Sequence, residues 1–418
     1  MKKLHSLLVV SLMALMVFNV FSCKKKTTDP DATTQGIIDQ TVQSTRVGVE
    51  TELGKIIPTL NIFIQTPNGS WYSSSAGTGY QPITADTYFR FASNTKNFTA
   101  TSVLNMMEDG WLDLDALITD TIPGSDIPYV PVSAEWNFPY KGQITIKMLL
   151  NHSAGVYDVD NDSVPGYQGY SYTQYTQYFE PNHQFTATEM VNQLVIHNLY
   201  YFIPGTGKHY SNTGYAIAGE IVERVYSFHA GTPKTLTDYM YDYIYGPGTT
   251  VPLSMHFPYL ASDQDLPAPY SCGHILLDGT NVNEICSYNM SAQVAEGNGY
   301  STMRNLNTWI RTNLKGENVL TPASVELMKN SVSVADPTYG LGCFYKQNLG
   351  YGHNGARIGN LTMMFYDPLT DVSFVTYISA INEEDITPTF FAISDLAYAV
   401  RAALGYPGKP DLKPIINL

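Results

Sequence analysis

The sequence has few charged side chains, and basic residues are the scarcer kind. Asp, Glu, Lys and Arg make up 14% of the 418 residues, and 23 Lys and Arg stand against 37 Asp and Glu, which gives a formal net charge of −14. A protein that binds nucleic acid needs a basic face for the phosphates, so we expect no nucleic-acid partner. The 31 tyrosines suit a surface that binds through hydrogen bonds and aromatic rings instead.

Two signatures of common hydrolases are also missing. The sequence contains no His-Glu-x-x-His motif and no Cys/His spacing typical of zinc, so we expect neither a metal nor another cofactor. The run Asn151-His152-Ser153-Ala154-Gly155 lacks the first glycine of a Gly-x-Ser-x-Gly elbow, which disfavours an α/β-hydrolase.

The N-terminus is typical of an exported lipoprotein. Lys2 and Lys3 precede an apolar run over residues 7–18, and Val20-Phe21-Ser22-Cys23 resembles a bacterial lipobox. We expect residues 1–22 to be a signal peptide and residues 23–35 a flexible tether. An acylated Cys23 would anchor the chain to the cell-envelope membrane, most simply on its periplasmic side. The alternative is an uncleaved membrane anchor.

Three cysteines remain after Cys23. In an oxidising compartment, Cys272 and Cys286 would pair across the intervening loop. Alternatively, Cys272, Cys286 and Cys343 are all buried free thiols.

The stretch Phe89–Phe98 carries the first candidate for catalysis. It reads as a strand end, a polar turn and an amphipathic helix that begins at Ser93. A serine hydroxyl needs an adjacent base to become a nucleophile, and Lys96 lies one helical turn later on the same face. The backbone N–H groups of a helix N-terminus can hold a developing oxyanion. The alternative is that Ser93 is a plain N-cap and Lys96 a solvated residue of the first turn.

Two further motifs follow in the chain. Tyr210-Ser211-Asn212 precedes a helical run, and His353-Asn354-Gly355 lies between two apolar stretches. In this order the motifs resemble the serine β-lactamase and penicillin-binding-protein superfamily, most closely the class C β-lactamase-like serine hydrolases, which include D-Ala-D-Ala carboxypeptidases and esterases. Further segments that resemble family motifs are Leu149–Gly155, Gly299–Thr302, Tyr339–Gly342, Gly352–Gly355 and Asp371–Ile381.

The resemblance implies roles for these residues. Ser93 would attack a carbonyl and form an acyl-enzyme that water hydrolyses, and Tyr210 would shuttle protons. Lys96 would be either the base or the charge that keeps Tyr210 acidic. Asn212 would contact the substrate amide, and the backbone N–H groups of Ser93 and Ala356 would form the oxyanion hole.

His353 departs from the Lys-Thr-Gly of true class C β-lactamases. A histidine with an ordinary pKa of about 6.5 is mostly neutral at pH 7, which weakens the case for a β-lactam as the natural substrate. Arg357 would replace the missing cation, or else be an outward-facing arginine in a salt bridge. Gly355 would let a substrate approach the backbone.

The sequence predicts an α+β fold, an α/β sandwich of β-lactamase/transpeptidase type over residues 36–418. Strands at 60–65, 70–75, 339–345, 361–366 and 372–381 would form a five-stranded antiparallel sheet flanked by N- and C-terminal helices, with a mostly helical subdomain at roughly 96–290. The tyrosine-rich segment 157–185 would form a rim over the cleft, or else pack down on its own rings.

The expected activity is that of a serine hydrolase acting on an amide or ester of a small molecule or peptide. A D-Ala-D-Ala carboxypeptidase-like or D-amino-acid peptidase activity is favoured. The alternatives are a carboxylesterase with little β-lactamase activity, or a catalytically silent, envelope-anchored binding protein of the same fold.

Overall fold

The computed structural model describes residues 30–277, 282–382 and 384–410. The expected signal peptide, Cys23 and the first part of the tether lie outside the described residues. Over the described ranges, no helix is both long enough and apolar enough to cross a membrane.

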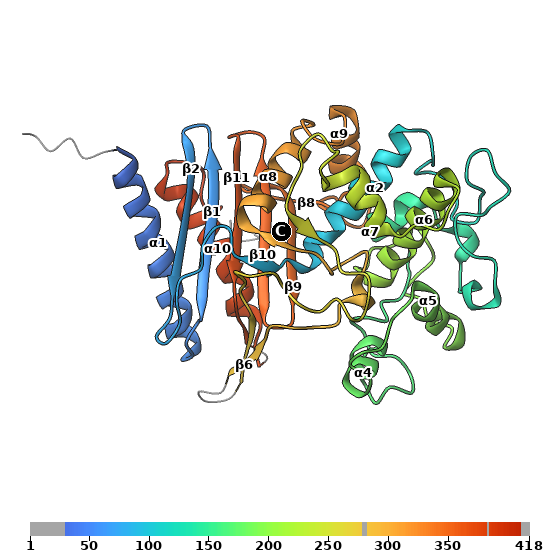
Figure 1. Ribbon diagram of the computed structural model, residues 1–418, viewed down its shortest axis with the longest axis horizontal. Coiled ribbons are helices and arrows are strands. Elements are labelled where there is room, and N and C mark those ends of the chain that lie inside the picture. Colours follow the sequence, from blue (N-terminus) through green and yellow to red (C-terminus); the bar gives the residue numbers. More distant parts are fainter. Residues whose placement is uncertain (1–29, 278–281, 383, 411–418) are drawn as a thin grey trace, which may run out of the picture.

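A six-stranded antiparallel sheet built from both ends of the chain forms one part of the molecule (Figure 1). Its strand order is β2-β1-β11-β10-β9-β8. The strands are β1 (Thr59–Thr66), β2 (Gly69–Ala76), β8 (Phe344–Lys346), β9 (Gly350–Arg357), β10 (Asn360–Asp367) and β11 (Val372–Ile378).

The sheet has one strand more than the sequence predicted, and it is β9 that was missed. A strand expected at 339–345 shrinks to β8, because Gly342 adopts a φ of 60° and packs against the carbonyl of Lys96. β9 contains three glycines, which are unfavourable in strands. A Cβ on Gly352 would lie 2.0 Å from the carbonyl oxygen of Met364, so glycine is what lets β9 pair closely with β10.

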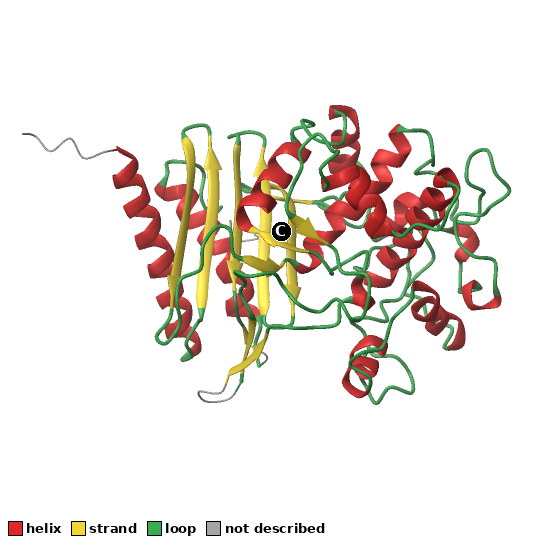
Figure 2. Cartoon of the chain, viewed as in Figure 1, coloured by secondary structure: helices red, strands yellow, loops and turns green. Residues whose placement is uncertain are grey.

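Helices cover both faces of this sheet (Figure 2). Alternate residues of β1 point to opposite sides, so that Ile62 and Ile64 join one apolar core and Phe63 the other. α1 (Pro30–Leu53) and α10 (Thr387–Ala403) contribute to the first core, and α8 (Met303–Leu314) to the second. This arrangement confirms the predicted α/β sandwich.

The second part of the molecule is mostly helical and contributes to the larger core. Its helices are α2 (Thr95–Glu108), α3 (Ile146–Leu150), α4 (Tyr172–Phe179), α5 (Ala187–Ile196), α6 (Asn212–Ala230), α7 (Leu236–Tyr239) and α9 (Pro322–Asn330). Two small sheets complete the described structure, with strands β3 (Tyr88–Arg90), β4 (Met255–His256) and β7 (Tyr300–Thr302), and β5 (Gly273–Leu276), β6 (Val282–Ile285) and β12 (Ile381–Asn382).

The structure differs from expectation at the tether. α1 begins at Pro30, so residues 30–35 belong to a helix and not to a flexible tether. Proline is well suited to the first turn of a helix, where its missing N–H costs nothing. The side chain of Gln35 also donates to the carbonyl of Tyr72 on β2, which fastens this turn to the sheet.

The segment 157–185 packs largely on itself. The Tyr157 hydroxyl donates to the carbonyl of Ser163 at 2.6 Å, and the Tyr167 ring contacts Tyr172 and Tyr175. Part of the segment forms α4. These contacts agree with a loop held down by its own rings, although Tyr167 and Gln177 also bond to Gln193 and Asn289 outside the segment. Asn161 lines the cavity described below, as a rim residue would.

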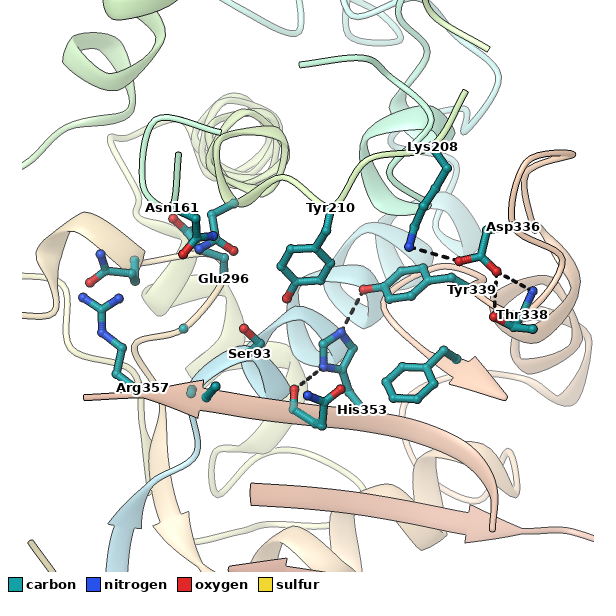
Figure 3. Close-up of a pocket in the computed structure, with 17 residues that line it drawn as sticks. Ser93, Asn161, Lys208, Tyr210, Glu296, Asp336, Thr338, Tyr339, His353 and Arg357 are labelled. Carbon is teal, nitrogen blue, oxygen red and sulfur yellow. Dashed lines mark hydrogen bonds and ion pairs between the residues drawn. The ribbon is translucent and has the colours of Figure 1, made fainter. Parts of the chain in front are cut away.

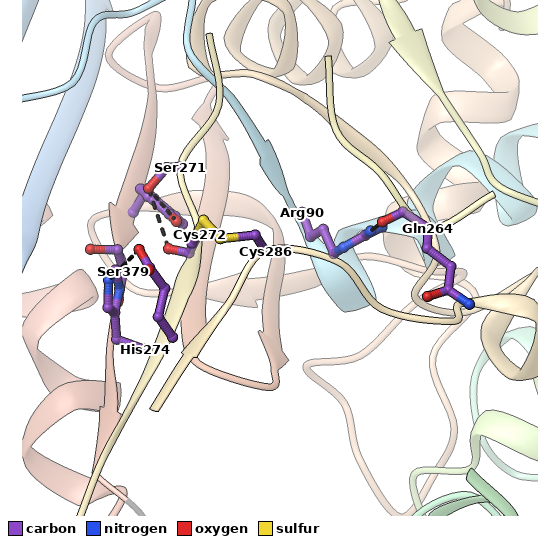
Figure 4. The surroundings of a disulfide bond; sticks show 9 residues. Arg90, Gln264, Ser271, Cys272, His274, Cys286 and Ser379 are labelled. Carbon is purple, nitrogen blue, oxygen red and sulfur yellow. Dashed lines mark hydrogen bonds and ion pairs between the residues drawn. A yellow bond between two sulfur atoms is a disulfide. The ribbon is translucent and has the colours of Figure 1, made fainter. Parts of the chain in front are cut away.

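Cys272 and Cys286 form a disulfide that closes the β5–β6 hairpin, and Cys343 is a buried free thiol (Figure 4). The hairpin rests on the turn between β9 and β10, where the N–H of His274 donates to the carbonyl of Gly359 at 2.7 Å. Of the two cysteine arrangements considered, the paired one is present. The hairpin that the disulfide closes thus contacts the main chain at Gly359, two residues beyond Arg357 on β9.

Candidate active site

Ser93 lies where the helical part meets the sheet. β3 leads through Phe91 into a single turn of 3₁₀ helix, Ala92–Asn94, and α2 follows directly. Ala92 has a φ of 49°, an unfavourable conformation for a residue with a Cβ. The buried Asn94 side chain donates to the Thr362 hydroxyl on β10, which fixes the turn to the sheet.

A cavity of about 420 Å³ opens in front of Ser93 (Figure 3). Six of the residues singled out from the sequence line it: Ser93, Tyr210, Asn212, His353, Ala356 and Arg357. Lys96 lies beneath its floor, and Gly355 is not among the lining residues.

Lys96 is fully buried, and its amine has three partners. Nζ lies 2.6 Å from Oδ1 of Asn212, 3.0 Å from the carbonyl oxygen of Glu296 and 3.3 Å from Oγ of Ser93. The first two partners can only accept hydrogen bonds. A neutral amine would therefore give its two hydrogens to them and direct its lone pair at the Ser93 hydroxyl, which is the arrangement a general base needs.

The surroundings of Lys96 make that neutral state accessible. Burial lowers the pKa of Lys96 to about 8, although the nearby carboxyls of Glu296, Asp158 and Asp160 oppose the change. About one-tenth of an amine with this pKa is neutral at pH 7, far more than of an ordinary lysine.

Asn212 is tied up within the protein. Its amide oxygen accepts from Lys96, its Nδ2 donates to Oδ2 of Asp160 at 2.7 Å, and its backbone N–H donates to Oδ2 of Asp158 at 2.9 Å. These bonds show Asn212 orienting Lys96, and its expected contact with the substrate amide stays a prediction.

Tyr210 leads into α6, and its hydroxyl points toward Ser93 (Figure 3). Nζ of Lys96 lies 4.6 Å from the centre of the Tyr210 ring. Burial raises the pKa of Tyr210 well above its ordinary value, and hydrogen bonding with Ser93 opposes the rise. Tyr210 is therefore a neutral phenol at pH 7, able to donate a proton.

Ala356 on β9 lines the cavity beside Ser93, as an oxyanion hole formed by these two residues requires. Gly355 has a different part in the site from the one expected. A Cβ there would lie 2.2 Å from the carbonyl oxygen of Phe91, so the backbone that approaches Gly355 is that of the nucleophile's own turn. Only glycine lets β9 come this close to Ser93.

His353 is buried, and both of its ring nitrogens are occupied. Nε2 lies 2.8 Å from the Tyr339 hydroxyl, and Nδ1 lies 2.5 Å from the carbonyl oxygen of Asn354. Burial lowers the pKa of His353 to about 3, and the positive charge of Lys96 adds to the effect. His353 therefore lines the cavity without charge and with no ring nitrogen free for a substrate.

Permanent cations stand at the two ends of the cavity (Figure 3). At one end the guanidinium of Arg357 lies 3.9 Å from Asp160 and 5.1 Å from the centre of the Tyr288 ring. At the other end Lys208 pairs with Asp336 at 3.0 Å. Arg357 is thus a cavity residue rather than an outward-facing one.

Several site residues were not assigned roles from the sequence. Glu296, Lys208 and Asp336 belong to none of the recognised motifs. His152 and Tyr339 lie inside two segments that resemble family motifs, and that was the available signal. In the described ranges, the one trio of potential metal ligands is Cys272, Glu284 and Cys286, in which both sulfurs are committed to the disulfide.

The Lys96→Ala variant should lose at least about two orders of magnitude in kcat/KM, the usual size for a lost proton-transfer group. In the wild type, kcat/KM should rise with pH through about 8, because the amine acts as a base only after losing its proton. The measurement is a pH–rate profile. An ionisation near pH 6.5 in its place would point to a histidine base and contradict the assignment.

Glu296→Gln should move the ionisation of Lys96 to lower pH. The carboxyl of Glu296 is the main charge that opposes the effect of burial on the pKa of Lys96, and glutamine keeps its shape without that charge. The measurement is the same pH–rate profile. An unchanged profile would show that the Glu296 carboxyl carries no charge beside the amine, in line with the raised pKa that burial gives it.

Comparison with known proteins agrees with this geometry. A profile of the beta-lactamase family matches residues 48–388. Penicillin-binding protein 4* of Bacillus subtilis is 30% identical over 149 residues, which cover 35% of this chain and 27% of that protein. Lovastatin esterase of Penicillium rubens is 31% identical over 173 residues, which cover 40% of this chain and 39% of that protein. The chain thus spans well under half the length of these curated relatives.

Solved structures share the fold. A D-amino acid amidase from Ochrobactrum anthropi SV3 superimposes with a TM-score of 0.66 at 21% identity, covering 88% of this chain and 98% of that one. A D-stereospecific amidohydrolase from a Streptomyces species gives 0.63 at 22% identity, covering 83% and 94%. Because the family profile extends over most of the chain and takes in the Ser93 turn, Tyr210 and β9, the chain belongs to the beta-lactamase family.

Proposed function

We propose that this protein is a serine hydrolase and cleaves amide bonds in small, polar peptides or amino-acid amides through an acyl-enzyme on Ser93, as a D-Ala-D-Ala carboxypeptidase or D-amino-acid peptidase does. The observation that carries the proposal is the buried amine of Lys96, 3.3 Å from Oγ of Ser93, whose other two partners can only accept hydrogen bonds. In this mechanism Lys96 takes the serine proton as Ser93 attacks the carbonyl. The oxyanion then forms next to Ala356.

The state of Tyr210 supports an amide rather than an ester as substrate. An amine must be protonated before it can leave, whereas an alcohol depends less on a proton donor. Tyr210 holds its proton because burial raises its pKa, and its hydroxyl is aimed at Ser93. It is therefore placed to protonate the leaving nitrogen.

The cavity wall supports a polar substrate. Arg357 and Lys208 stand at its two ends, each beside a carboxylate, so dipolar groups such as peptide units find partners on both sides of Ser93. A long apolar acyl chain would displace water from these ion pairs without offering them a hydrogen bond. The D-amino acid amidase and the D-stereospecific amidohydrolase of the same fold support the choice of D-configured substrates.

A carboxylesterase is the second candidate, and the neutral His353 favours it over a β-lactamase. The wall at His353 offers no cation to a β-lactam carboxylate. A silent binding protein is the least favoured reading, because the contacts of Lys96 with Ser93 and Asn212 are intact.

A fluorophosphonate should label the protein once, on Ser93. Intact-mass measurement and peptide mapping test this, and Ser93→Ala should abolish labelling. Ser153→Ala is the matched control, since Ser153 is a buried serine whose hydroxyl is bound to Asn151 at 2.6 Å. Label on Ser153, or persistent labelling in Ser93→Ala, would refute the nucleophile assignment.

A substrate panel separates the candidate activities. We expect D-amino-acid amides and D-Ala-D-Ala peptides to exceed nitrocefin in kcat/KM by at least about tenfold, a difference of 1.4 kcal/mol in transition-state free energy. p-Nitrophenyl butyrate should have a lower kcat/KM than the best amide once each value is divided by the rate of the uncatalysed hydrolysis, because its leaving group is more reactive. An enzyme that prefers nitrocefin, or that hydrolyses only the ester, would overturn the proposed substrate class.

A further inference from the structure

A chain of hydrogen bonds runs along the wall of the cavity through two histidines and a tyrosine. The N–H of Ser211 lies 3.2 Å from Nδ1 of His152, and Nε2 of His152 lies 3.2 Å from the Tyr339 hydroxyl. That hydroxyl lies 2.8 Å from Nε2 of His353. Nδ1 of His353 ends the chain, 2.5 Å from the carbonyl oxygen of Asn354.

The backbone groups at the two ends of this series of hydrogen bonds determine which atom donates in each bond between neutral rings. A backbone N–H can only donate, so Nδ1 of His152 is an acceptor, and the proton of that ring is on Nε2. A carbonyl can only accept, so Nδ1 of His353 is the donor. Tyr339 therefore accepts from His152 and donates to His353, whose Nε2 carries no proton.

The surroundings of the chain oppose any added positive charge. His152, Tyr339 and His353 are all at least nine-tenths buried. The charged groups that face the histidines are cationic, namely Lys96 and Lys208, and His209 also faces His152. The remaining titratable neighbours, Tyr210, Tyr215 and Cys343, stay protonated and neutral because burial raises their pKa values.

We propose that Tyr339 is a positioning residue: it bridges the two rings whose opposite tautomers the backbone of Ser211 and Asn354 sets, and so holds His152 and His353 in place as neutral imidazoles. The wall beside Tyr210 then presents ring faces and no charge. The lowered pKa values of both histidines agree with this assignment. A proton on Nε2 of His353 would compete with the Tyr339 proton and would force that hydroxyl to turn, for example toward Tyr215.

The bridge that Tyr339 forms between His152 and His353 also affects the neighbouring catalytic groups. The His152 ring packs against the Tyr210 ring, with centroids 4.3 Å apart, so the bond that holds His152 also sets the orientation of Tyr210. Because neither histidine titrates, the two rings bring no positive charge to Lys96 in its working range. This catalytic consequence rests on the proposed function of Ser93, Lys96 and Tyr210, whereas the tautomers do not.

Nitrogen-15 NMR of the histidine rings in the full-length wild-type protein tests the proposed tautomers and the neutrality of both rings without any substrate. We expect the proton on Nδ1 of His353 and on Nε2 of His152, with neither ring titrating between about pH 5 and 9, where an ordinary histidine would. Assignment uses the spectra of His152→Gln and His353→Gln. The opposite tautomer in either ring, or titration near pH 6.5, overturns the proposal even if variants of Tyr339 fail to fold.

Tyr339→Phe tests the positioning role. Loss of the bridge should raise the pKa of His353 by about one unit and shift the Nε2 signals of both rings, while Ser211 and Asn354 keep the tautomers unchanged. The rate of fluorophosphonate labelling at Ser93 should fall about tenfold, and this readout does not depend on the natural substrate. Tyr345→Phe, which removes the same hydroxyl from an exposed tyrosine on β8, should change none of these. Unchanged histidine signals in Tyr339→Phe, or altered signals with an unchanged labelling rate, would refute the positioning role.

Discussion

The site depends on keeping the amine of Lys96 out of water. Burial removes its solvation and moves its pKa toward neutrality, and this is what makes it useful as a base. The same burial would be prohibitively unfavourable if the amine had no partners. The carbonyl of Glu296 and the amide of Asn212 provide them, and the buried Asp158 and Asp160 hold that amide in place. A layer of polar groups inside an otherwise apolar region is the result.

The second constraint is the close approach of the sheet to the turn that carries the nucleophile. Gly355 packs on the carbonyl of Phe91, and Asn94 reaches across to Thr362. These contacts set the distance between Ser93 and Ala356, which come from different parts of the fold. An added methyl group at Gly355 would separate them, and the oxyanion hole would then open.

The sequence predicted what depends on short-range spacing. Ser93 and Lys96 are one helical turn apart, so their proximity follows from the helix alone, and the terminal strands show regular apolar patterns. β9 was missed because its glycines are unfavourable in strands. They are needed there because neighbouring backbone lies too close for a side chain, and a single sequence does not reveal that proximity. Glu296 and Tyr339 went without roles for a related reason. Both reach the site by tertiary packing. No local pattern marks Glu296, and the motif-like segment that contains Tyr339 does not show which neighbours its hydroxyl meets.

His353 shows both what could be predicted from the sequence and what could not. Its neutrality at pH 7 was predicted from the ordinary behaviour of histidine, and the structure gives a stronger cause in burial and in two occupied nitrogens. Its part in substrate binding was inferred from a lysine at the same place in related enzymes. That inference identified the position in the cavity but not its chemistry. An imidazole with both nitrogens hydrogen-bonded cannot bind a substrate carboxylate as an ammonium group does.

The pairing of β1 with β11 joins the beginning of the folded chain to its end. During synthesis, β1 emerges from the ribosome long before β11, and it has only the hairpin partner β2 until then. The strand that carries Ala356 is likewise incomplete without β10, which comes late in the sequence. A nascent chain can therefore form the Ser93 turn but not the wall opposite it. The two sides of the cavity can come together only after β10 has been synthesised.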